Sequence, residues 1–261
     1  MTRDQDRRKA DAVLSGGNLI MSDNTYDRKL LQIVNGPRPG TIEDVIRVMQ
    51  SIEATLPNDD GLKWFNFLYL EVTKYIGQNP PTNGWEDVAW LTRLDVVFAN
   101  FYFSAIADYL NREPTTPNSW EALFEARHST GIDRIQFALA GMNAHINHDL
   151  SLALLQTDDE LHLAPSLDGP EHGDYERVNG LLEVVLPSAL KVLSSGILGE
   201  IAQDTGRIGQ LLAIWNVRVA RDLAWGFADH LRDLGGIQRQ FALAAQDKLT
   251  GALGRSLMLP F

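Results

Sequence analysis

The residues best suited to chemistry lie in the segment AGMNAHINHDL, residues 140–150. On a helix that turns by about 100° per residue, His145 and Asp149 lie about 40° apart, and His148 lies about 60° to the other side of His145. Three groups able to bind a metal ion therefore share one helix face. The i,i+4 spacing lets His145 and Asp149 converge on one ion or act as an acid/base pair.

Two interpretations of this face stay open. In the first, His145, Asp149 and His148 are catalytic and hold a divalent ion such as zinc, iron or manganese. Asp174 would be a fourth ligand, from an acidic, Pro- and Gly-rich segment (156–174) that we expect to be a loop able to close over a pocket. In the second, these groups only tie helices together, as buried histidines often do.

A second cluster is predicted in the helix that follows Arg207. Arg218, Arg221 and Trp225 lie within about 60° of one another, opposite an apolar face formed by Leu212, Val219, Leu223 and Phe227. Two guanidinium groups beside an indole can hold a carboxylate or phosphate and stack on a planar group. We expect these three residues, with Asn147, to bind substrate. Arg221 should be buried, facing a cavity or paired with Asp95 or Asp149.

Helical periodicity dominates the chain, whereas strand-like alternation is scarce. The sequence predicts an all-α, single-domain bundle of seven or eight helices with a long central helix that carries the polar groups. Residues 1–25 are expected to be disordered, and residues 26–261 to form the helical domain. The expected helices cover approximately residues 42–56, 61–77, 86–110, 118–128, 132–155, 175–198, 207–234 and 238–253.

Polar residues set in these helices should be satisfied within the fold. Asn143 and Asn147 fall on the face opposite His145 and should bond to neighbouring helices. Asp95, Asn66 and Asn100 are expected to be hydrogen-bonded core residues. A capping box formed by Asn118 and Glu121 should start the short helix at that point.

Composition excludes several classes of function. The 261 residues include no cysteine, which rules out thiol catalysis, Cys-ligated zinc and iron–sulfur clusters. The formal net charge of −11 argues against nucleic acid as a partner. No segment is apolar enough to span a bilayer and no signal-peptide pattern is present, so we expect a cytoplasmic protein. Phosphate-binding glycine motifs are missing, so no nucleotide cofactor is expected.

Five motifs together resemble a bacterial family of helical proteins known as a domain of unknown function. Across about residues 41–231 they are GLKWFNFLYLEVT (61–73), RLDVVFANFYFSA (93–105), IQFALAGMNAHINHDLSLAL (135–154), DYERVN (174–179) and ARDLAW (220–225). The resemblance implies an all-helical fold and lends no activity.

The HINHD segment alone resembles zinc-dependent phospholipase C and the P1-type nucleases, whose helices carry H-x-x-x-D metal ligands, as His145 and Asp149 would. Those enzymes also use a processed N-terminal Trp and a second His/Asp set. This chain has six histidines in total and no signal peptide. Neither a metal cluster nor phosphoester hydrolysis follows from this likeness.

Three functions are consistent with these patterns. The first is a metal-dependent enzyme acting on a small organic molecule, most simply by hydrolysis with a metal-activated water. The second is a metal-free cyclase or isomerase, or a ligand-binding helical protein, that uses His145 and Asp149 as a hydrogen-bonded pair. The third is a non-catalytic scaffold whose buried polar network specifies packing.

Overall fold

The computed structural model describes residues 25–194 and 216–259. Within these ranges the chain forms nine α-helices from residue 42 onward, a further helical segment at residues 25–34, one short π-helical turn and no strand. The predicted all-α, single-domain bundle is therefore confirmed, and the expected seven or eight helices are close to the observed number. The predicted disordered segment 1–25 lies outside the described residues except at its last position, where a helical segment (25–34) begins.

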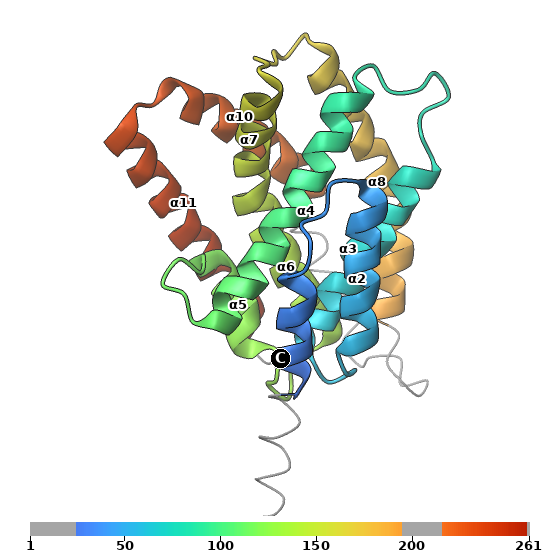
Figure 1. Cartoon of the computed structure of the whole chain (residues 1–261), viewed down its shortest axis with the longest axis vertical. Coiled ribbons are helices and arrows are strands. Elements are labelled where there is room, and N and C mark those ends of the chain that lie inside the picture. Colours follow the sequence, from blue (N-terminus) through green and yellow to red (C-terminus); the bar gives the residue numbers. More distant parts are fainter. Residues whose placement is uncertain (1–24, 195–215, 260–261) are drawn as a thin grey trace, which may run out of the picture.

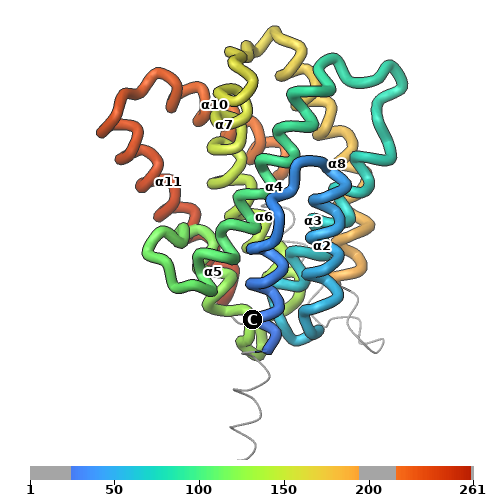
Figure 2. Tube along the Cα trace, in the orientation of Figure 1, coloured from blue at the N-terminus to red at the C-terminus, as the bar shows by residue number. Residues whose placement is uncertain are grey.

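The helices surround a central pair, α6 and α7, which continue one another through the π turn η1 (Figures 1 and 2). α3 and α8 lie on one side of this pair, and α11 lies on the other side at the edge of the bundle. The elements are α2 (Ile42–Thr55), α3 (Gly61–Gln78), α4 (Val88–Asn111), α5 (Asn118–Ala126), α6 (Arg134–Ala144), η1 (His145–Asp149), α7 (Leu150–Leu161), α8 (Pro170–Ser194), α10 (Val217–Asp233) and α11 (Gly236–Leu257).

The central helix is longer than the sequence suggests. From Arg134 the chain stays helical, through the π turn, to Leu161, where His162 ends it in a left-handed conformation (φ 56°). The predicted 156–174 loop is therefore wrong in extent, because helix covers its beginning and α8 starts at Pro170. Only residues 162–169 connect the two helices, which leaves a short connection instead of a long closing loop.

Two helix starts are satisfied by carboxylates from distant helices. The Asp174 carboxylate of α8 accepts the backbone N–H groups of Glu86 and Asp87 at 3.0 and 2.7 Å, just before α4 begins. It thereby anchors the end of the α3–α4 connection, which stands away from the bundle in Figure 2. At α5 the predicted capping box is wrong: Asp247 of α11 accepts the backbone N–H groups of Asn118 and Ser119, both at 2.9 Å.

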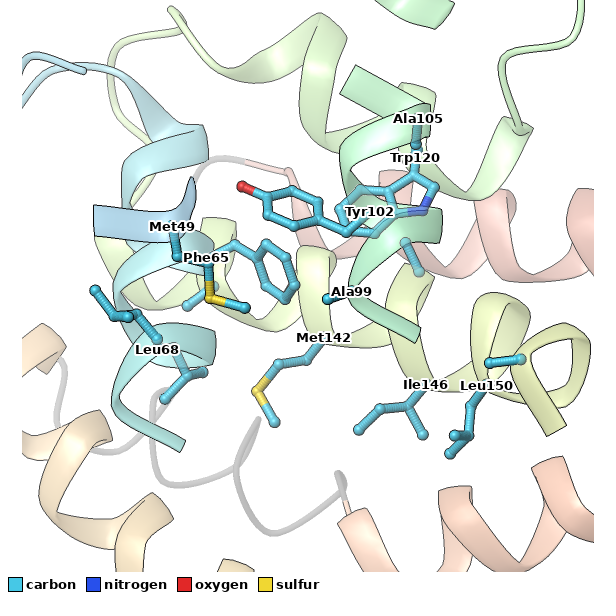
Figure 3. Packing of buried hydrophobic residues seen from close by; sticks show 14 of the residues in the cluster. Met49, Phe65, Leu68, Ala99, Tyr102, Ala105, Trp120, Met142, Ile146 and Leu150 are labelled. Atoms are coloured by element: carbon cyan, nitrogen blue, oxygen red, sulfur yellow. The ribbon is translucent and has the colours of Figure 1, made fainter. Parts of the chain in front are cut away.

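Close packing of α3 against α6 depends on glycine. The ring of Phe65 lies directly over Gly141, where an added Cβ would come within 2.3 Å of the Phe65 Cγ atom. Phe65 also makes edge contacts with Tyr102 and Trp120, at centroid distances of 5.0 and 5.2 Å (Figure 3). Of this aromatic cluster, Phe65 also lines the cavity described below.

We predict that Gly141→Ala destabilises the fold by about 1–3 kcal/mol, because the methyl group collides with the Phe65 ring. Gly180→Ala is the matched control, since Gly180 lies in a helix and a Cβ there meets no atom within 4 Å. Helix propensity should make the control more stable by about 0.5–1 kcal/mol. Urea unfolding measures both changes, and equal stability of the two variants would contradict the close approach.

Candidate functional site

The HINHD segment forms a π-helical turn in the middle of the central helix. The backbone N–H of Leu150 bonds to the carbonyl of His145, five residues earlier. Such turns often occur at functional sites, because the extra residue in the turn redirects the side chains around it. His145, His148 and Asp149 are all buried here. The structure therefore places the three predicted catalytic residues together in the interior.

Asp149 is the hub of this cluster. Its Oδ2 atom accepts hydrogen bonds from Trp120 Nε1 at 2.9 Å and from His145 Nδ1 at 3.0 Å. Its Oδ1 atom accepts from His148 Nδ1 at 2.9 Å. Burial acts to raise the pKa of Asp149, but the hydrogen bonds from the two histidines hold it below its usual value. We therefore assign Asp149 as a carboxylate, which requires both histidines to donate from Nδ1.

The imidazole of His145 lies within an aromatic cage. The Phe98 ring stacks on it at a centroid distance of 3.5 Å, and the Tyr69 ring meets it at 4.6 Å. Burial lowers the pKa of His145 and outweighs the opposing effect of Asp149. Its Nε2 atom is buried and has no hydrogen-bond partner among the described residues. His145 is thus a neutral imidazole whose Nε2 lone pair is unused.

His145 forms part of the wall of a cavity of about 90 Å³ between α2, α3, α4, α6, α8, α10 and the π turn. Most of the wall is aliphatic or aromatic, and Figure 3 shows Leu68, Met142 and Ile146 of this wall near the aromatic cluster. The polar exceptions are Tyr69, Thr73, Asp95, His145 and Arg221. An apolar cavity with a few convergent polar groups is the usual form of a small-molecule site.

Asp95 of α4 lies in the cavity wall, although the sequence predicts only a hydrogen-bonded core residue or a partner of Arg221. It is half-buried, lines the cavity, and makes no hydrogen bond or ion pair within the described residues. Burial raises the pKa of Asp95 to about 7, against the opposing charge of Arg221. Asn66 and Asn100 are satisfied core residues as predicted, with bonds to the carbonyls of Met49 and Val96 among others, whereas the same prediction is wrong for Asp95.

Arg221 is buried and lines the same cavity, as predicted. Only 7% of the residue is exposed. Its Nε donates to Asn179 Oδ1 at 2.7 Å, its Nη2 donates to the Tyr175 carbonyl at 2.7 Å, and its guanidinium carbon lies 3.9 Å above the centre of the Tyr175 ring. These contacts fix the side chain in place without a carboxylate partner in the described part of the chain.

The other predicted substrate-binding residues of α10 lie elsewhere. Arg218 is half-exposed and pairs with Glu183 at 3.1 Å, and buried Trp225 packs against Trp90 outside the cavity wall. The expected apolar face of this helix is reversed: Val219 and Leu223 are 50% and 67% exposed. Leu212, the first member of that face, lies outside the described residues.

His148 and Asn147 face away from the cavity, toward α11. His148 Nε2 lies 3.7 Å from Asp247 Oδ1, and His148 lines a separate surface cleft with Asp149 and Asp247. Burial opposes the charged form, but these two carboxylates raise the pKa of His148 above its usual value.

The asparagines on this side tie the central helix to α11, as predicted. Asn147 Nδ2 donates to Asn143 Oδ1, and Asn143 Nδ2 donates to the Thr250 carbonyl, both at 2.9 Å. The Asn147 backbone carbonyl accepts a further bond from Gln246 at 2.7 Å. Asn147 therefore does not contact the cavity in which it was expected to bind substrate.

These contacts do not favour the predicted divalent-metal site. Both oxygens of Asp149 already accept N–H groups, and both histidines turn Nδ1 toward that carboxylate. The Asp174 carboxylate already accepts hydrogen bonds from backbone N–H groups before α4 and from the Arg177 side chain. In the described ranges, no group of three or more His, Asp or Glu side chains converges as metal ligands would. We derive no metal chemistry from this donor set.

Fold and site together define an all-α protein with a buried His–Asp pair beside an apolar cavity. A family model described as a family of unknown function (DUF5995) matches residues 42–260, so the chain belongs to that family. The resemblance to a helical family seen in the sequence is confirmed. No curated protein and no solved structure matches the chain. Among the described helices, none is long and apolar enough to cross a membrane.

We predict that Asp95→Asn gains stability relative to wild type as the pH rises. In the folded protein Asp95 keeps its proton up to a pKa of about 7, against 3.8 for a free carboxyl. The protonated carboxyl therefore stabilises the folded state at low pH, and the wild type loses this stability as the pH rises through 7. The variant's advantage should grow by about 2–3 kcal/mol between about pH 5 and pH 8. Urea unfolding at both pH values measures it. The exposed Asp59→Asn should show no such trend, and a flat Asp95→Asn difference would contradict the assignment.

Proposed function

We propose that the cavity binds a small, mainly apolar organic molecule and that the protein moves a proton on it, as an isomerase does. One observation carries this proposal: two ionisable residues line one apolar cavity, and neither His145 Nε2 nor the Asp95 carboxyl has a hydrogen-bond partner among the described residues. Ionisable groups with displaced pKa values in a cavity are typical of acid/base catalysis.

His145 is suited to be the base. Its Nε2 lone pair can take a proton from a carbon next to a carbonyl group, while the carbon–hydrogen electron pair moves to form the enol. Asp149, bonded to Nδ1 at 3.0 Å, would stabilise the imidazolium that results. Phe98, stacked on the ring, holds the imidazole in position without offering a competing hydrogen bond.

Asp95 is suited to be the acid. With a pKa of about 7, its carboxyl keeps its proton through much of the neutral range and can give it to the carbonyl oxygen as the enol forms. Return of the proton from His145 to a different carbon, while the enol oxygen gives its proton back to Asp95 and the carbonyl re-forms, would complete an isomerisation and restore both groups. The apolar wall strengthens each charge interaction by excluding water.

The other functions considered from the sequence receive less support. Metal-dependent hydrolysis would need Asp149 and the histidines to face one ion, whereas both histidines turn Nδ1 toward the Asp149 carboxylate itself. A scaffold role explains His148, Asn143 and Asn147, which join helices, but it leaves the unpartnered Asp95 unexplained. Ligand binding without catalysis uses the same cavity and is separated from proton transfer by the experiment below.

We predict that the protein accelerates deuterium exchange of the α-hydrogens of cyclopentanone in D2O, followed by NMR. His145→Gln and Asp95→Asn should each reduce the acceleration by about 10²–10⁴-fold, the usual contribution of a positioned acid or base. Arg218→Gln, on the surface of α10, is the control and should exchange at the wild-type rate.

Each result of this experiment has a distinct meaning. Bound cyclopentanone, detected by shifts of the His145 ring resonances, without faster exchange would favour a ligand-binding protein over an isomerase. Equal exchange with wild type, His145→Gln and Asp95→Asn would refute the proposed roles of both residues.

A further inference from the structure

Arg221 is a buried cation that forms no salt bridge in the described part of the chain. Its contacts are with the Asn179 amide oxygen, the Tyr175 carbonyl and the face of the Tyr175 ring, all of which are neutral. Buried arginines are almost always paired with an acidic group, because an isolated charge is costly to remove from water. No described carboxylate is paired with Arg221, although Asp95 lines the same cavity and is influenced by its charge.

The geometry leaves part of this guanidinium free for a ligand. Nε and Nη2 are bonded to α8, whereas Nη1 makes no hydrogen bond within the described residues, and Arg221 lines the cavity. A guanidinium fixed on one edge is pre-organised to donate from the other edge. Its natural acceptor in an apolar surrounding is an anionic oxygen.

Asp95 is the only acidic side chain in the described cavity wall, and the other titratable groups there are Tyr69 of α3, His145 of the π turn and Arg221 of α10. α2 and α8 contribute only aliphatic side chains. Protonated Asp95 could donate a hydrogen bond to an anion, whereas ionised Asp95 would repel it. Asp95 and Arg221 together therefore favour an anion bound with one proton on Asp95.

We infer that the cavity ligand is a monocarboxylate with an apolar body, whose carboxylate is bound by Arg221 and by the protonated Asp95 side chain. This inference rests on the proposed cavity ligand and names its chemical class. A groove of about 470 Å³ on the α8–α10 side shares Met142, Leu182, Leu186 and Val217 with the cavity wall. An apolar body larger than the cavity would extend along these shared residues into that groove.

The test compares two probes of nearly the same shape, cyclopentanecarboxylate and its neutral amide, cyclopentanecarboxamide. Titration calorimetry on the full chain should show the carboxylate binding about tenfold or more tightly at about pH 6. Its affinity should fall as the pH rises from about 6 to 8, because the ligand stays ionised over this range while Asp95 loses its proton. Asp95→Asn should remove this pH dependence, and amide binding should be insensitive to pH.

Substitution of Arg221 tests whether ligand binding depends on the charge of this side chain. Arg221→Gln should lose the preference for the carboxylate and still bind the amide, whereas Arg255→Gln, at an exposed arginine of α11 that lines neither the cavity nor the groove, should bind as wild type does. If Arg221→Gln fails to fold, the wild-type comparison of the two probes still decides. Equal affinities for carboxylate and amide would overturn this inference and leave the proposed function standing. Binding of neither probe would overturn both.

Discussion

The buried carboxylate of Asp149 is the interaction on which the rest of the site depends. Its two oxygens accept N–H groups from Trp120 of α5 and from both histidines of the π turn. Because each donor fills a lone pair, the cluster holds the charge without a neighbouring Lys or Arg. The same bonds fix the Nδ1 protonation of His145 and orient its ring. Loss of this charge would leave three buried donors without an acceptor, which is costly.

On the side of the cavity, by contrast, the polar groups are not paired with one another. There the wall is mainly aromatic and aliphatic, and within the described residues Arg221 forms no salt bridge while the Asp95 carboxyl and His145 Nε2 have no hydrogen-bond partner. A structural network would be expected to pair these groups, as Asp60 and Arg127 pair elsewhere in the core. Unpaired polar groups beside an apolar space lower the stability of the fold. A role in ligand binding and proton transfer would explain why they are present.

Much of this could be predicted from the sequence because it depends on local spacing. The i,i+4 placement brought His145 and Asp149 together, and the burial of Arg221 was expected. The π turn was not expected, since a regular 3.6-residue period places His148 on the same face as His145, whereas the structure turns it toward Asp247. Asp95 and the reversed apolar face of α10 depend on which helices pack together, and no local pattern contains that information.

We infer that Asp149 holds His145 as a neutral base with an unprotonated Nε2. Nitrogen-15 NMR of the histidine side chains tests it most directly, with His145 assigned by comparison with His145→Gln. The account predicts a neutral ring protonated at Nδ1 from about pH 6 to 8, with Nε2 resonating as an unprotonated nitrogen. A His145 that is an imidazolium at neutral pH, or one protonated at Nε2, would contradict it.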